Sequence, residues 1–296
     1  MLRRQFLFLA AAAAADKSGP AVLRVAAWPP TGDALAARVD GKPARIVRVR
    51  RAGDDLLILV VLDLTGDLSL VDPAKEALVA ELRKMPSNAW AGLLRSQDGL
   101  RVLVDPGPDR ESLISALQSL QIAGRAGLLE TIEPAAQLGS GILQKSPVRL
   151  AVLYLTDSNI YNYREDYTNP VINYSDSRDL SRRFPETLIR EKTSKLSEVL
   201  AAYAVPIFVV HLAWLRDRLN EAYQTGLQQM VETTGGQVWF CRTPSEIPTN
   251  VEHAFSRILS HWAIDLEAPD RSSKTFTVVL SDGGQDLPCR SRFLKR

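Results

Sequence analysis

The chain has 296 residues, of which 46% are hydrophobic and 24% are charged, and its formal net charge is +2. This apolar content is enough for a real core and excludes a disordered chain. No run of about 18 apolar residues occurs, so no membrane-spanning helix is expected. The mild charge gives no reason to expect nucleic-acid binding.

The first fifteen residues have the pattern of a secretory signal peptide. Arg3 and Arg4 form a basic start, residues 6–15 are an unbroken apolar run, and small side chains precede Asp16. We therefore expect residues 1–15 to be a signal peptide. The mature chain is then expected to be exported and to be periplasmic or extracellular. The basic pair suits the general secretory or the twin-arginine route, and the sequence leaves both open.

The next segment, residues 16–54, is expected to hold short strands, with a tight turn at Asp40-Gly41. Residues 56–62 are seven consecutive aliphatic residues, which favours a strand buried on both faces of a parallel sheet. From there strand and helix patterns alternate to about residue 262. This alternation predicts an α/β fold with a doubly wound, mostly parallel sheet and helices on both faces.

The expected elements are as follows. Helices are expected at 73–85, 109–120, 127–143, 186–203, 216–233 and 245–262, and strands at 22–25, 45–49, 56–62, 89–95, 100–104, 150–155, 205–212, 237–240, 275–280 and 289–294. The strands outside residues 55–262 are too few to fold alone. We therefore expect an N-terminal β segment, residues 16–54, to pair with a C-terminal one, residues 263–296, as a small β layer beside the main domain.

Polar clusters follow two of the apolar strands. One is Asp63-Leu64-Thr65-Gly66-Asp67, and the other is Thr156-Asp157-Ser158. Open α/β sheets bind ligands at the carboxyl ends of their strands, and carboxylate and hydroxyl oxygens suit Mg²⁺, Mn²⁺ or Ca²⁺. The alternative is that these residues only cap the helices that follow.

Six segments, taken in order, resemble the von Willebrand factor type A (VWA) domain of exported bacterial proteins, and they cover nearly the whole mature chain. They are residues 39–43; Asp63, Thr65 and Asp67 at the positions of the family's Asp-x-Ser-x-Ser motif; residues 124–132; residues 155–157; residues 205–208; and residues 234–238.

The resemblance implies a metal-ion-dependent adhesion site, in which a divalent ion keeps one position open for a carboxylate of a partner protein. It thus implies a protein-binding module and not an enzyme. The metal residues would be Asp63, Thr65, Asp67 and Asp157. Asp67 replaces the family's second Ser, and Ala126 replaces its Thr, which removes one hydroxyl ligand. We therefore expect a partly degenerate site that binds Mg²⁺, Mn²⁺ or Ca²⁺ weakly or not at all.

Residues 158–185 form an unusually long connection that is rich in Tyr and Asn. Such side chains make adaptable contacts at low entropic cost. We expect Tyr161, Tyr163 and Tyr167 to contact the partner protein. The alternative is a solvated loop that packs on itself.

An enzymatic alternative rests on the same aspartate. Residues 63–66 also resemble the nucleophile motif of haloacid-dehalogenase-like phosphatases, with Asp63 as nucleophile, Thr156 as the second-motif hydroxyl and residues 281–286 as the metal motif. That last motif should precede a further helix and strand, yet only ten residues remain. The sequence therefore favours the binding module.

Cys241 and Cys289 are the two cysteines of the chain. In an oxidising compartment they either pair or remain separate thiols, and the sequence leaves both open.

Overall fold

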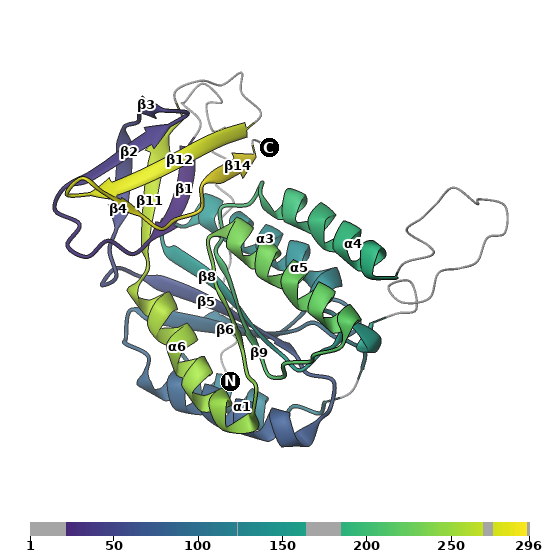
Figure 1. The fold of residues 1–296 in the computed structure, drawn as a ribbon. Coiled ribbons are helices and arrows are strands. Elements are labelled where there is room, and N and C mark those ends of the chain that lie inside the picture. The colour runs from purple at the N-terminus through teal and green to yellow at the C-terminus, as the bar shows by residue number, and fades with distance from the viewer. Residues whose placement is uncertain (1–21, 123, 164–184, 269–274, 295–296) are drawn as a thin grey trace.

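The computed structural model describes residues 22–122, 124–163, 185–268 and 275–294 (Figure 1). The expected signal peptide, residues 1–15, and Tyr167 lie outside the described residues. Within the part of the chain that is described, no helix is long and apolar enough to cross a membrane.

A six-stranded sheet forms the centre of the α/β part, in the order β10-β9-β8-β5-β6-β7. Neighbouring strands are parallel except for β6 and β7, which are antiparallel. Its strands are β5 (Leu56–Asp63), β6 (Ala89–Arg95), β7 (Arg101–Gly107), β8 (Arg149–Thr156), β9 (Ile207–His211) and β10 (Val238–Phe240). The doubly wound, mostly parallel sheet that the sequence predicted is confirmed.

Helices cover both faces of this sheet because its central strands are apolar on both sides. Every residue of β5 and β8 is buried. Alternate residues of β5 face two separate cores: Ile58 and Val60 pack with α1, α2 and α6, whereas Leu59 and Val61 pack with α3, α4 and α5. The helices are α1 (Leu68–Lys84), α2 (Arg110–Ser119), α3 (Leu128–Lys145), α4 (Pro185–Leu200), α5 (Arg218–Thr234) and α6 (Ile247–Ser260), with short 3-10 turns η1 (Ile160–Asn162) and η4 (Pro244–Glu246).

Strands from the two ends of the chain build a second, smaller layer, which lies above the α/β part in Figure 1. One sheet has the order β1-β11-β4 and the other β13-β12-β2-β3, with β14 also paired to β12. The strands are β1 (Val22–Ala27), β2 (Leu35–Val39), β3 (Lys42–Pro43), β4 (Ile46–Arg50), β11 (Trp262–Glu267), β12 (Thr275–Asp282), β13 (Gln285–Leu287) and β14 (Arg292–Leu294). Both sheets contribute side chains to a core of their own, among them Val25, Val39, Ile264 and Phe276. The predicted β layer of N- and C-terminal segments is therefore confirmed.

Arg149 ties the two layers together at the start of β8. Its side chain is buried, and its guanidinium donates to the carbonyls of Ala52, Asp54, Leu259 and His261 at 2.5–3.2 Å. These carbonyls lie in the β4–β5 connection and at the C-terminal end of α6 before β11, where the chain passes between the layers. Burial lowers the pKa of Arg149 to about 10, and the planar fork still satisfies all four carbonyls.

Two local predictions differ from the structure. Helix α1 begins at Leu68 and not near residue 73, because Asp67 caps it by accepting from the Ser69 amide, so Pro73 lies inside the helix. The Asp40-Gly41 turn joins β2 to β3, two strands that the sequence did not predict. Both residues of this turn have positive φ, 50° and 76°, which favours Gly.

Candidate functional site

The structure brings the two predicted polar clusters to one edge of the sheet. Asp63 is the last residue of β5 and Thr156 the last of β8, and the parallel register places them side by side. His211, the last residue of β9, is the next neighbour of Thr156. The carboxyl ends of three adjacent strands therefore form the floor of the candidate site.

Asp63 is fully buried, and protein groups use both of its oxygens. Oδ1 accepts from the Ser96 hydroxyl at 2.6 Å and from the Gly127 amide at 2.7 Å. Oδ2 accepts from the Thr156 hydroxyl at 2.9 Å. Sequence reasoning missed Ser96 and Gly127. The available signals were that Ser96 directly follows a predicted strand and that Gly127 follows Ala126 in the family motif.

Gly127 is required by packing as well as by its hydrogen bond. A Cβ at this position would lie 2.1 Å from the Ser96 carbonyl oxygen, so a larger residue would push the α3 start away from β6. The close approach of these two backbones is what aims the Gly127 amide at Asp63.

Asp157 accepts three backbone amides from the loop that follows β5. Thr65 donates to Oδ1 at 2.5 Å, and Gly66 and Asp67 donate to Oδ2 at 3.2 and 3.4 Å. Consecutive amides that converge in this way form an anion-binding nest, and here an internal carboxylate fills it. Burial raises the pKa of Asp157 and outweighs the opposing effect of these hydrogen bonds.

A chain of buried hydroxyls leads from this floor into the core. Thr156 Oγ1 lies 2.6 Å from Ser158 Oγ, which in turn lies 3.2 Å from the Tyr163 hydroxyl and 3.3 Å from that of Tyr223. The two tyrosine hydroxyls are 3.0 Å apart. Tyr163 is 5% exposed, and burial raises its pKa well above the ordinary value.

Tyr163 is therefore a core residue in this structure, which corrects the expectation that its ring contacts a partner. Its hydroxyl holds the segment after β8 against α5. Tyr161, by contrast, is 57% exposed and donates to the Asp217 carboxylate at 2.8 Å. This hydrogen bond raises the pKa of Tyr161.

The three carboxylates expected to bind metal are engaged by protein donors, so they do not fit a divalent ion as they are arranged here. The carboxylates of Asp63 and Asp157 accept protein donors, as described above, and Asp67 accepts the Ser69 amide and hydroxyl at 3.0 and 2.6 Å. Ala126 supplies no side-chain oxygen. Among the described residues, no group of three or more His, Cys, Asp or Glu side chains is placed to hold a metal ion.

In the phosphatase alternative, Asp63 does meet Thr156, but the expected metal motif, residues 281–286, lies away from both. Asp63 lies in the six-stranded sheet with both oxygens occupied, whereas Asp282 ends β12 in the other layer. There Asp282 accepts the amides of Gly32 and Ala34 at 2.8 and 3.2 Å. No nucleophile–metal pair of that kind forms between them.

Three large apolar side chains are exposed around the polar floor. Leu68 follows β5 and is 63% exposed, Tyr161 follows β8, and Trp214 follows β9 and is 38% exposed. Trp214 stands edge-on against Phe240, with ring centroids 4.9 Å apart. We call Leu68, Tyr161 and Trp214 the rim.

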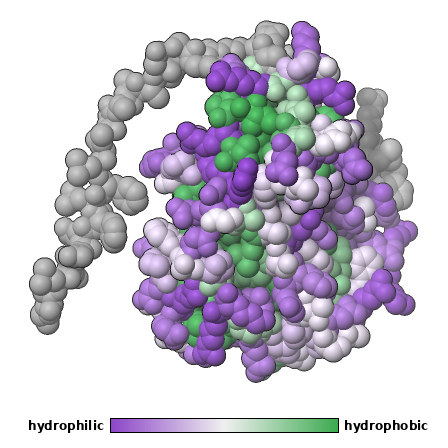
Figure 2. All heavy atoms as spheres, turned by 90° about the vertical axis from the view of Figure 1, so that its left-hand side faces the viewer, coloured by the Kyte–Doolittle hydropathy of each residue, from purple (hydrophilic) through white to green (hydrophobic). Residues whose placement is uncertain are grey.

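Apolar surface also occurs elsewhere. Figure 2 shows it gathered on the upper part of the molecule, at the height of the β layer in Figure 1. Val22 on β1 and Val47 on β4 are about half exposed in that layer. The rim differs from these because its members follow three neighbouring strands that end at one polar floor.

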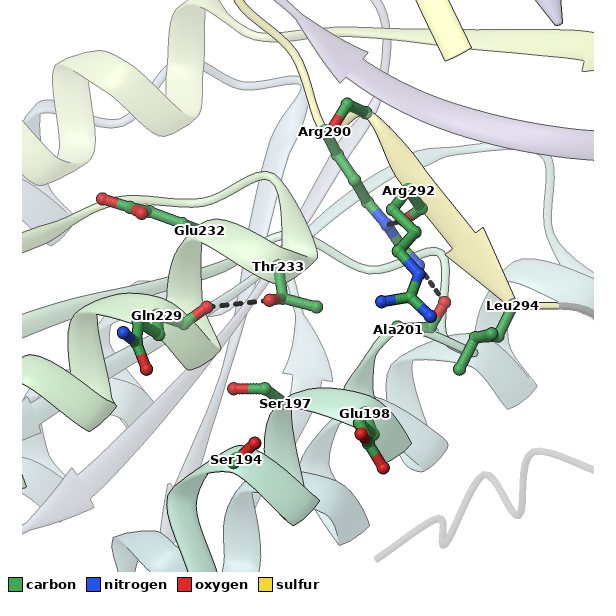
Figure 3. Close-up of a pocket in the computed structure, with 11 residues that line it drawn as sticks. Ser194, Ser197, Glu198, Ala201, Gln229, Glu232, Thr233, Arg290, Arg292 and Leu294 are labelled. Atoms are coloured by element: carbon green, nitrogen blue, oxygen red, sulfur yellow. Dashed lines mark hydrogen bonds between the residues drawn. The ribbon is translucent and has the colours of Figure 1, made fainter. Parts of the chain in front are cut away.

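A cavity of about 440 Å³ lies between the C-terminal halves of α4 and α5 and the C-terminal segment of the chain (Figure 3). Arg290 is one of the residues that line the cavity. Its guanidinium donates to the carbonyls of Ala201 and Tyr203 and lies over the Phe293 ring, 4.0 Å from the ring centroid. Burial lowers the pKa of Arg290 to about 10. Helices α4 and α5 begin near the carboxyl ends of the strands and run antiparallel to them. Their C-terminal halves, with the cavity between them, therefore lie toward the amino ends of the strands, whereas Asp63 lies at a carboxyl end.

Both cysteines are free thiols in the structure. Cys241 is buried and Cys289 is partly buried. Burial raises the pKa of Cys241 to about 11, so its thiol is protonated at neutral pH.

No protein-family model matches the chain, and a search of curated protein sequences finds no match. Solved structures do resemble it. A von Willebrand factor type A protein from Catenulispora acidiphila has 11% identity and a TM-score of 0.45, and the match covers 93% of this chain and 74% of that one. A D319A mutant of the PilB minor pilin from Streptococcus sanguinis has 12% identity and a TM-score of 0.49, with 70% and 62% covered.

An aerotolerance-related membrane protein from Bacteroides fragilis has 13% identity and a TM-score of 0.42, with 69% of this chain and 99% of that chain covered. Structures named as VWA domains are thus among those that this chain resembles. At 10–13% identity and TM-scores below 0.5, the likeness assigns no ligand, activity or partner to the chain.

Proposed function

We propose that the chain is an exported, VWA-type protein-interaction module that holds a protein partner at the carboxyl ends of β5, β8 and β9. It does so through the apolar rim and without a bound metal ion. The observation that carries this proposal is the exposure of Leu68, Tyr161 and Trp214 around a floor whose carboxylates already have protein donors.

The rim has the composition of a protein-binding surface. Exposed Tyr and Trp are enriched at interfaces, and truncating a buried aromatic anchor typically costs about 2 kcal/mol or more of binding energy. Tyr161 is also held in place by Asp217, so less of its side-chain freedom is lost when a partner binds. The carboxylates beneath contribute shape and rigidity, because each is fixed by backbone or hydroxyl donors.

Export is part of the proposal and rests on the N-terminal pattern alone. A fusion of residues 1–21 to a reporter enzyme that is active only outside the cytoplasm tests it. Activity is expected with the natural segment and should disappear when residues 6–12 are replaced by polar residues.

The binding test compares three forms of the immobilised mature chain on the same exported-protein fraction. They are the natural chain; a rim variant carrying Leu68→Ser, Tyr161→Ser and Trp214→Ser; and a control variant with Val47→Ser, Leu138→Ser and Val199→Ser. The control residues are exposed and apolar but lie elsewhere. A protein retained by the natural and control forms, lost from the rim variant and unaffected by EDTA supports the proposal, whereas retention that EDTA abolishes overturns the metal-free mechanism.

A further inference from the structure

The cavity between α4, α5 and the C-terminal segment is lined mostly by polar side chains (Figure 3). Two packed helices normally turn apolar side chains toward each other. Here the lining residues of each helix recur at three and four positions, so each helix presents one polar face to the cavity. They are Ser194, Ser197 and Glu198 on α4, and Gln229, Glu232 and Thr233 on α5. Polar faces on both sides of an open space indicate a place for a ligand.

The two helices are in close contact one turn before the cavity. A Cβ on Gly226 would lie 2.4 Å from the Thr193 hydroxyl oxygen, so the helices approach there without a gap. Thr193 lies one turn before Ser197 on α4. The cavity therefore opens beyond this contact, and its volume of about 440 Å³ lies within the range of roughly 300–1,000 Å³ that is typical of small-molecule sites.

Arg290 is a buried cation in the lining of this cavity. Three of its five N–H groups donate to the carbonyls of Ala201, Tyr203 and Arg292, which leaves two N–H groups for another acceptor. Burial lowers the pKa of Arg290, and no carboxylate among the described residues offsets that effect. Buried charges are normally paired, so this guanidinium favours an anion in the cavity.

Two neighbouring side chains on α4 also lack a partner. The Ser197 hydroxyl oxygen is buried, and no group in the described part of the chain lies within hydrogen-bond distance of it. The ion pairs of α4 use Glu186 and Glu191, and they leave Glu198 exposed and unpaired among the residues that the structure describes. The cavity thus offers a cation, a hydroxyl donor and a free carboxylate.

We propose that this cavity binds a small zwitterion of about the size of a dipeptide. The carboxylate of the ligand accepts from Arg290 and from the Ser197 hydroxyl, and its ammonium group donates to Glu198. The lining side chains carry two positive charges and two negative ones, at Arg290, Arg292, Glu198 and Glu232. A ligand with one charge of each sign suits this balance, whereas a polyanion would face two carboxylates.

This site is separate from the proposed partner surface. The cavity lies toward the amino ends of the strands, whereas the rim lies past the carboxyl ends of β5, β8 and β9. The rim variant with Leu68→Ser, Tyr161→Ser and Trp214→Ser should therefore bind the zwitterion as the natural chain does.

Titration calorimetry with L-alanyl-L-alanine tests the proposal, and two blocked forms of the same dipeptide are the matched controls. N-acetyl-alanyl-alanine lacks the ammonium group, and alanyl-alanine amide lacks the carboxylate. The natural chain should bind the free dipeptide and should bind each blocked form about tenfold or more weakly, because each loses a charged hydrogen bond.

Two substitutions locate the binding in the cavity. Ser197→Ala should weaken binding of the free dipeptide about fivefold, and Glu198→Gln about tenfold, without lowering the thermal midpoint. Glu198→Gln should also reduce the preference for the free dipeptide over the N-acetyl form. Ser256→Ala and Glu252→Gln, at exposed positions on α6, are the matched controls and should bind like the natural chain. Arg290 is kept in all variants because it also holds two backbone carbonyls of the chain.

Three results overturn the proposal. The first is a natural chain that does not bind the free dipeptide at about 10 mM. The second is a blocked form that binds as tightly as the free dipeptide, since the site would then recognise only one of the two charges. The third is binding that Ser197→Ala and Glu198→Gln leave intact, or that the rim variant loses, because the dipeptide would then lie elsewhere.

Discussion

The Asp157 carboxylate accepts the Thr65 backbone amide at 2.5 Å, so the loop after β5 closes on a residue that follows β8. With Gly66 and Asp67 donating to the same carboxylate, a side chain of the protein itself accepts the three converging amides of this loop. The same residues that suggest a metal site in the sequence thus act as a structural clasp.

Removing this clasp should destabilise the protein locally. Asp157→Ala leaves three amides without their acceptor, and we expect a loss of about 1–3 kcal/mol in the free energy of unfolding. Asp157→Asn retains an acceptor oxygen and should lose less. Urea denaturation of the two variants measures the difference, and an alanine variant as stable as the natural chain would contradict the clasp.

Metal binding should be weak or absent. Titration calorimetry with Mg²⁺, Mn²⁺ and Ca²⁺ should give no micromolar affinity, because the carboxylates have protein donors and Ala126 supplies no oxygen. Restoring the family pattern with Asp67→Ser and Ala126→Thr should strengthen whatever affinity exists. Tight binding by the natural chain would show that the ion displaces the internal donors.

Acid should destabilise the fold through two buried histidines. Burial lowers the pKa of His211 and of His261 from 6.5 to about 4. Between these values the unfolded chain binds protons that the folded chain does not, so the free energy of unfolding falls as the pH falls from about 6.5 to about 4. A shift of this size corresponds to roughly 3 kcal/mol for each histidine.

Unfolding measured by urea at several pH values checks this slope. The His261 ring nitrogen Nδ1 lies 2.6 Å from the Ile258 carbonyl oxygen, and His261→Asn keeps a hydrogen-bond donor for that carbonyl. This variant should reduce the dependence of the free energy of unfolding on pH by about half. His253→Asn, at an exposed position, is the matched control. A slope that His261→Asn leaves unchanged would contradict the assignment.

Arg149 should tolerate no substitution well. Arg149→Met removes the guanidinium donors from the carbonyls of Ala52, Leu259 and His261 and should lower the free energy of unfolding by about 3 kcal/mol. The Asp54 carbonyl keeps a second donor, the side-chain amide of Asn88 at 3.0 Å. Arg149→Lys should recover little, because an ammonium has three donors and no planar fork. Thermal unfolding of both variants tests this, and full recovery by lysine would mean that charge alone matters there.

The parts of the fold that depend on local pattern could be predicted from the sequence. The aliphatic run of β5 is sufficient to predict a buried strand. Asp98-Gly99 is likewise sufficient to predict the tight turn between β6 and β7. Parallel strand ends must share an edge, so the meeting of Asp63 with Thr156 followed as well. Asp157 was correctly placed there, but its hydrogen-bond partners could not be predicted.

The remaining features depend on residues far apart in the chain. Whether Tyr163 is buried is decided by Tyr223 and Ser158, and the exposed tyrosine two positions earlier has the same local composition. The two donors to Asp63 Oδ1 come from the end of β6 and the start of α3, so no single short motif contains both. In the sequence, Arg149 resembles any charged residue ahead of a predicted strand. The four carbonyls that accept from its guanidinium are about 95–112 positions away in the sequence, so no local pattern indicates them.

The central claim is that the rim, and not a metal ion, holds the partner. Its most direct test is the affinity of a recovered partner for the natural chain and for the Tyr161→Ser/Trp214→Ser variant, each measured with Mg²⁺ and with EDTA. We predict a loss of about tenfold or more in the variant, an unchanged thermal midpoint and no effect of EDTA. An affinity that needs Mg²⁺, or that the two substitutions leave intact, would contradict the account.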